Sequence, residues 1–166
     1  KSGMFNGVNP FQPGVDPETL DAAEIGVKSE WFDSRLRLNA AVFYYDYEDI
    51  QLSQVAQGIT VILNAASGEI WGGDLELTAV PYEGVGTLEV TAGLSALDAT
   101  YDRFPNAPFL TPNPNGGNIQ SAGDASDNRM IRSPKLTSTL GFNYSLPLGG
   151  FVFEANASWY HNDGYF

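Results

Sequence analysis

Residues that could perform catalysis or bind a metal are few in this sequence, and they are dispersed. The sequence contains one histidine, His161, and no cysteine. A zinc site or a general base needs convergent partner groups, whereas His161 stands beside Tyr160 at the expected end of a strand. No nucleophile stands in a recognisable set with a base. We therefore predict that the protein is not an enzyme and needs no cofactor.

A second candidate is the acidic segment 124–128, which reads Asp-Ala-Ser-Asp-Asn. Its oxygen atoms could bind calcium. The segment lacks the spacing and the glycine of an EF-hand loop, however. A solvated loop is therefore the preferred interpretation.

The composition favours short strands and turns, and it excludes some functions. Aromatic residues make up 13% of the chain, which also contains 18 Gly and 10 Pro. The net charge of −12 repels phosphate backbones and argues against nucleic-acid binding. No apolar run reaches the roughly 18 residues of a transmembrane helix, and residues 1–4 contain no apolar signal region. We expect a mature, internal or trimmed chain.

Apolar and polar side chains alternate with a period of two along most of the chain, which is typical of β-strands. Leu38 and Val42 fall on one side of such a run, and Arg37 and Asn39 fall on the other. We predict an all-β fold, an antiparallel meander of about six strands. The predicted segments are an irregular lead-in over 1–21 and hairpins over about 22–55, 60–101 and 134–163, with short turns near 33, 81 and 147.

Residues 102–133 interrupt the alternation with many prolines and glycines, so we predict a long loop. If the strands belong to an outer-membrane barrel, this loop would be extracellular, because such barrels have short periplasmic turns and longer extracellular loops. Its aromatic rings and amides could bind a small-molecule ligand, and a mobile loop without a ligand is the alternative. The candidate ligand-binding residues are Phe104, Phe109, Asn113, Asn115, Asn118 and Gln120.

The charged side chains gather on one side of the predicted strands. A soluble sheet would place them in bulk water, whereas a transmembrane barrel would place them in a wet lumen and turn the apolar side toward lipid. Aromatic residues near the strand ends suit interfacial girdles. These features favour a barrel over a soluble all-β domain. The residues predicted to face the lumen are Arg37, Asn39, Asp74, Glu76, Glu89 and Glu154.

Three segments carry a family resemblance. Residues 18–51, with Glu24, Gly26 and Lys28 at fixed spacing, closely resemble a recurring hairpin of TonB-dependent outer-membrane receptors. Residues 64–77 and 133–137 resemble two further motifs of that family. Asp74 is a departure, because the family usually has Glu at that position. The resemblance covers about residues 17–162.

The resemblance implies part of a barrel of about 22 strands with an N-terminal plug. We expect this chain to be a piece that lacks the plug and the energy-coupling box, with its first and last strands unpaired. The implied partners are outer-membrane lipid, the rest of the barrel and the plug, a TonB-type energy-coupling protein and a small-molecule ligand. The implied function is import of a scarce ligand, such as an iron-siderophore, across the outer membrane of a Gram-negative bacterium. A soluble β-rich binding module and a passive porin-type channel are the alternatives.

Overall fold

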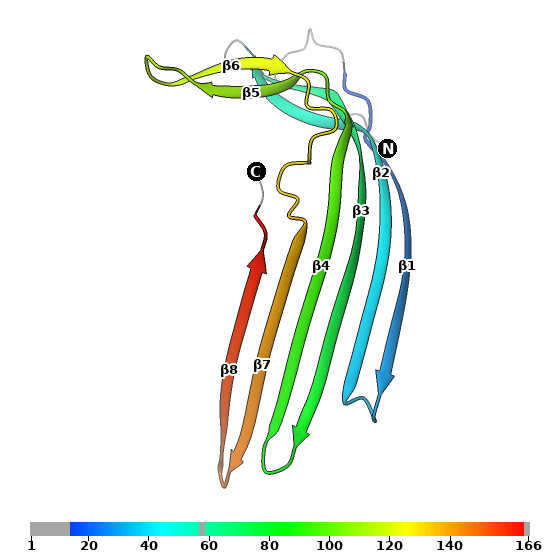
Figure 1. Cartoon of the computed structure of the whole chain (residues 1–166), viewed down its shortest axis with the longest axis vertical. Coiled ribbons are helices and arrows are strands. Elements are labelled where there is room, and N and C mark those ends of the chain that lie inside the picture. The colour runs from blue at the N-terminus through cyan, green and yellow to red at the C-terminus, as the bar shows by residue number, and fades with distance from the viewer. Residues whose placement is uncertain (1–13, 57–58, 165–166) are drawn as a thin grey trace. The chain divides into compact units, whose positions relative to one another are not determined.

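The computed structural model describes residues 14–56 and 59–164, and within them it contains eight strands and no helix. Six strands form one antiparallel sheet in the order β1-β2-β3-β4-β7-β8, and β5 and β6 form a second sheet of their own (Figure 1). The predicted all-β meander is thereby confirmed. The strands are β1 Thr19–Trp31, β2 Leu36–Ala56, β3 Ile59–Glu83, β4 Thr87–Arg103, β5 Ala107–Pro112, β6 Asn118–Gly123, β7 Leu136–Leu148 and β8 Phe151–Asn162.

Three short turns connect β1 to β2, β3 to β4 and β7 to β8 at one end of the six-stranded sheet (Figure 1). In the first, Phe32, Asp33 and Ser34 have φ angles of 57°, 54° and 65°, and Arg35 N donates to Phe32 O over 3.1 Å. The second begins later than the turn predicted near 81, because β3 continues through Pro81 to Glu83. Val80 N donates to Arg35 O over 2.8 Å, which keeps this end of β3 beside the end of the first turn.

The segment 102–133 contains structure that the sequence analysis did not predict. β4 extends to Arg103, and β5 and β6 pair antiparallel from Ala107 with Gly123 to Pro112 with Asn118. Both strands of a two-stranded sheet are edges, where proline is tolerated because no ladder bond is lost. At the tip, Gly116 and Gly117 have φ angles of 97° and 76°, which favour glycine. The residues that suggested an irregular loop therefore form a hairpin.

The chain forms two compact units. We call the first the loop-end unit; it comprises the chain up to Ala22 together with Tyr45–Ile70 and Ala99–Met130. We call the second the wall unit; it comprises Ala23–Tyr44, Trp71–Asp98 and the chain from Ile131. The three short turns belong to the wall unit, and the β5-β6 hairpin belongs to the loop-end unit.

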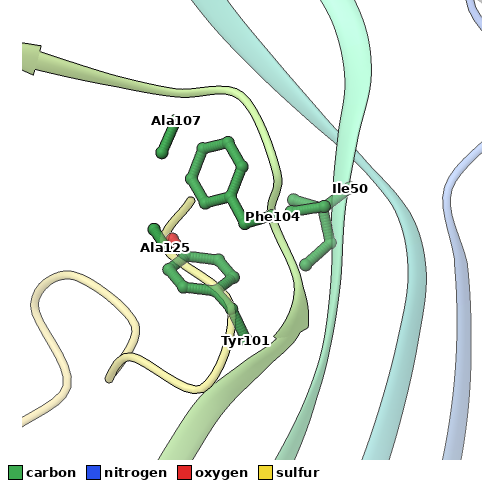
Figure 2. Packing of buried hydrophobic residues seen from close by; sticks show 6 residues of the cluster. Ile50, Tyr101, Phe104, Ala107 and Ala125 are labelled. Atoms are coloured by element: carbon green, nitrogen blue, oxygen red, sulfur yellow. The ribbon is translucent and has the colours of Figure 1, made fainter. Parts of the chain in front are cut away.

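Buried hydrophobic side chains are confined to the loop-end unit among the residues that the structure describes. Their main cluster surrounds Tyr101 and Phe104, whose ring centroids are 5.0 Å apart, and Figure 2 shows both rings beside Ala125. The described residues of the wall unit form no comparable core. The cluster consists of Ile50, Ala66, Tyr101, Phe104, Ala107 and Ala125.

Gly68 is a position in the loop-end unit where the packing requires glycine. A Cβ there would overlap the Met130 side chain and the Thr100 carbonyl oxygen. We expect Gly68→Ala to lower the free energy of unfolding by about 1–3 kcal/mol through overpacking. Gly150→Ala is the control, because nothing lies within 4 Å of a Cβ at that position. Urea unfolding measures both variants, and equal stability of the two would contradict the expected clash.

Candidate functional site

The apolar side of the wall unit is a continuous face across β1 to β4. Ile25, Val42, Gly73 and Ala96, one from each strand, line a single hollow of about 810 Å³. Tyr44 and Trp71 line the same hollow, with ring centroids 4.4 Å apart. Because these side chains come from alternate positions, the intervening residues of each strand point to the opposite face.

This apolar face continues over β7 and β8. Phe142 pairs with Ala157 and Leu140 pairs with Trp159, all at apolar positions of the alternation. Phe151 remains 81% exposed and Trp159 55% exposed. A β-sandwich would cover such a face with a second sheet about 10 Å away, and the described residues of the wall unit supply none.

The polar face of the wall unit is charged over β1, β2 and β3. Arg37 Nε forms an ion pair with Glu30 Oε1 over 3.1 Å, and Asn39 Nδ2 donates to Glu76 Oε2 over 3.3 Å. A hollow of about 510 Å³ lies on this face above Gly26 and Ala41. Its polar lining comes from Glu24, Lys28, Asn39, Asp74 and Glu76.

Over β4, β7 and β8 the polar face carries mostly uncharged groups. Glu89 pairs with Asn143, and Asn143 pairs with Asn156, so the three side chains form one row across the strands. The next row is Thr91, Gly141 and Ser158. The two rows enclose a hollow of about 270 Å³. Glu154 lies one row further, opposite Ser145.

The six residues predicted to face a lumen thus occupy the polar positions of their strands. Arg37, Asn39, Asp74 and Glu76 belong to the charged part, and Asn39, Asp74 and Glu76 line one hollow there. Glu89 lines the second hollow, whereas Glu154 lies outside it. The structure therefore brings them together in two groups.

The candidate ligand-binding residues of 102–133 are not gathered into one site. Phe104 is 7% exposed within the hydrophobic cluster, so its ring is a packing element and not the expected surface platform. Phe109 is 41% exposed and pairs with Ser121. Because Gln120 and Asn118 alternate with Ser121 along β6, they lie on the opposite face of the hairpin from Phe109.

Asn113 and Asn115 belong to the tip of the hairpin and form its turn. Asn113 N donates to Gly117 O over 2.9 Å, and Asn115 N donates to Asn113 Oδ1 over 3.0 Å. The Asn113 side chain is thus engaged with the backbone, as is common for asparagine in turns.

Sequence reasoning missed a further polar hollow, of about 380 Å³, in the loop-end unit. Glu48, Asp49 and Arg103 contribute charged groups to its lining. Asn64 fixes its wall, because Asn64 Nδ2 donates to Asp49 O over 2.7 Å. Asp49 has a φ of 56°, an unusual value inside a strand. No spacing in the sequence joins these residues, since they come from three strands.

The segment 124–128 forms a hydrogen-bonded turn. Ser126 N donates to Asp124 Oδ1 over 2.9 Å, and Phe104 N donates to Ser126 Oγ over 2.8 Å. Hydrogen bonds from the Ser126 side chain and backbone hold the pKa of Asp124 below its ordinary value of 3.8. Among the described residues, no group of three or more His, Cys, Asp or Glu side chains could hold a metal ion. The turn connects the segment 124–128 to Phe104 through the hydrogen bond from Phe104 N to Ser126 Oγ.

This turn predicts a local dependence on pH. Because the pKa of Asp124 is lower in the folded state than in the unfolded state, its contribution to stability is present above pH 3.8 and is lost as the pH falls through the folded value. We expect the protection of the Ser126 and Phe104 amides from exchange, relative to their intrinsic rates, to fall below about pH 4. Asp124→Asn should weaken this dependence and Asp127→Asn should retain it. Equal pH profiles in both variants would contradict the assignment to Asp124.

His161 lies on β8, where its ring stacks on Trp159 with centroids 5.7 Å apart and an interplanar angle of 7°. The two residues share the apolar face, because they are two positions apart on one strand. This contact gives His161 an aromatic partner.

In the part of the chain that the structure describes, no helix is long and apolar enough to cross a membrane. A family model described as TonB dependent receptor-like, beta-barrel matches residues 2–166. No solved structure matches the chain.

Proposed function

Because this chain belongs to the TonB-dependent receptor β-barrel family, a family of outer-membrane transporters, we propose that its wall unit is a membrane-spanning part of a receptor that imports a scarce ligand such as an iron-siderophore complex. The family implies the outer membrane of a Gram-negative bacterium. The proposed partners are lipid at the apolar face, a plug in the lumen, the remainder of the barrel, and a TonB-type protein that supplies energy.

The observation that carries this proposal is the uncovered apolar face of the wall unit. β7 and β8 contain 13 and 12 residues, enough for the roughly 9–11 that a barrel strand needs to cross a bilayer. Their apolar positions remain exposed, including Phe151 and Trp159. In water such a face would favour aggregation, whereas lipid would cover it. This argues against the soluble binding module.

The polar face supports an aqueous lumen. Its ion pair and carboxylates would be costly against hydrocarbon, where a Lys or Arg at the midplane costs about 2–4 kcal/mol. On the face opposite the apolar one, these charged groups would contact water or a polar plug instead of hydrocarbon. The polar positions predicted to face the lumen, including Arg37 and Asp74, fit this arrangement.

Fractionation and uptake test the proposal. The protein that contains this chain is expressed in a Gram-negative host, and we expect recovery in the outer membrane with heat-dependent electrophoretic mobility. Uptake of radioiron-labelled ferrichrome should stop when the host's energy-coupling protein is deleted. Recovery in the soluble periplasm would reject the membrane function, and uptake that persists without energy coupling would favour a passive porin-type channel.

A further inference from the structure

The tip of the β5-β6 hairpin carries an asparagine that is followed directly by two glycines. Asn115, Gly116 and Gly117 are all exposed. Among the asparagines that the structure describes, Asn115 alone precedes a glycine. Open space surrounds Gly116, because a Cβ built there would meet nothing within 4 Å. Solvent therefore reaches the peptide bond between Asn115 and Gly116.

This pair of residues can react with itself. The Gly116 backbone nitrogen can close a five-membered ring on Asn115 Cγ, and glycine has no Cβ to crowd that approach. The nitrogen loses its proton and forms a bond to Cγ, the Cγ–Nδ2 bond breaks, and ammonia leaves with a proton. Water then opens the resulting succinimide at one of its two carbonyl carbons. The products are aspartate and isoaspartate, and no oxidant, reductant or cofactor takes part.

We propose that Asn115 is a site of spontaneous deamidation, which introduces a carboxylate at the tip of the hairpin. The reaction needs only an exposed tip, so it is independent of the proposed transport function. It also needs the turn to open locally. Gly116 N donates to Asn113 O over 2.9 Å, and Asn115 N donates to Asn113 Oδ1 over 3.0 Å. While the first of these bonds holds, the proton that must leave is engaged, so the turn slows the reaction.

Two neighbouring asparagines lack this combination of features. Asn113 precedes Pro114, whose nitrogen has no proton to lose. Asn118 lies in β6 opposite Pro112 and precedes Ile119, whose branched side chain crowds the backbone nitrogen. Asn118 is equally exposed and belongs to the same hairpin. It is therefore an internal control for the effect of the glycine.

The two products should affect the hairpin differently. In isoaspartate the main chain runs through the former side chain, which adds one methylene group between residues 115 and 116. The turn is closed by Asn113 N, which donates to Gly117 O over 2.9 Å, and a longer chain between these residues cannot keep that geometry. Aspartate leaves the main chain unchanged. We expect amide exchange at Gly116 and Gly117 to lose protection in the isoaspartate form only.

The test follows the purified protein that contains this chain, in detergent, during incubation at mildly alkaline and mildly acidic pH. Proteolytic peptides are analysed by mass spectrometry, and isoaspartate is detected by enzymatic methylation. We expect deamidation at Asn115 to be at least about tenfold faster than at Asn118, and faster at the higher pH because a proton must leave the nitrogen. Denaturation in urea should accelerate the reaction at Asn115 further, since it removes the turn.

Three variants test the role of the turn. Asn113→Ala removes the Oδ1 acceptor and should accelerate deamidation of the folded protein by about twofold to tenfold, the effect of one lost hydrogen bond on the opening of the turn. Asn118→Ala is the matched control and should leave the rate at Asn115 unchanged. Asn115→Gln should abolish the isoaspartate signal from the tip. Heat-dependent mobility verifies that all three variants fold.

Two results would overturn the proposal. The first is equal rates at Asn115 and Asn118 in the folded protein. The second is an Asn115 that stays intact in the folded protein and reacts only in urea. An unchanged rate in Asn113→Ala would reject control by the turn.

Discussion

Leu140→Arg should prevent normal assembly of the barrel, whereas Thr139→Arg on the same strand should be tolerated. Leu140 pairs with Ala92 on β4 and with Trp159 on β8, on the apolar face. An arginine on the lipid face near the bilayer midplane costs about 2–4 kcal/mol. Thr139 pairs with Gly93 and Tyr160 on the polar face, where water solvates the guanidinium. The adjacent positions thus differ only in which face they occupy.

The measurement is the free energy of unfolding in lipid vesicles together with the yield of heat-modifiable protein in the outer membrane. We expect Leu140→Arg to lose about 2–4 kcal/mol and Thr139→Arg to lose less than about 1 kcal/mol. A larger loss in Thr139→Arg would invert the assignment of faces. Similar large losses in both would indicate that each face is enclosed by protein, which would count against a membrane wall.

Phe104→Ala should release the β5-β6 hairpin while the wall unit stays folded. Phe104 is 7% exposed, contacts Tyr101 and the rest of the cluster, and its backbone N donates to Ser126 Oγ (Figure 2). Truncating a buried phenylalanine costs about 3–5 kcal/mol. Because the hydrophobic cluster lies entirely in the loop-end unit, the loss should remain local.

Phe109→Ala is the matched control, since the Phe109 ring is 41% exposed and lies outside the cluster. Amide exchange and limited proteolysis between Thr111 and Ile119 report opening of the hairpin. Rapid cleavage is expected in Phe104→Ala and slow cleavage in Phe109→Ala. If Phe109→Ala opened the hairpin as readily, the stability of this segment would come from the β5-β6 sheet and not from the cluster.

Several features of the wall unit could be predicted from sequence because they depend on local order. A strand turns successive side chains to opposite faces, so the alternation around Arg37 and Asn39 assigned their face before any strand partner was known. The turn at Asp33 could be predicted in the same way. The family resemblance of residues 18–51 agrees with the family model that matches residues 2–166.

The structure of 102–133 could not be predicted in this way. Pro108 and Pro112 weaken any strand signal, yet a two-stranded sheet accepts both at its edges. The sequence also does not distinguish Phe104 from Phe109, because the burial of Phe104 depends on Ile50 and Ala66, which are distant in the chain. Residue type alone therefore suggests the ligand-binding candidates, and pairing across the hairpin places Phe109 on the opposite face from Asn118 and Gln120.

The sequence by itself determined the fold class, the two faces of the strands in the wall unit and the approximate places of the short turns, since all of these follow from neighbouring residues and the geometry of an extended chain. Only the tertiary structure decided which polar residues share a hollow, because strand register joins Glu89, Asn143 and Asn156 from three strands. It also decided that the buried hydrophobic residues lie in the loop-end unit, and that apolar residues of the wall unit such as Phe151 and Trp159 are exposed. Burial depends on contacts between distant segments, which no local pattern specifies.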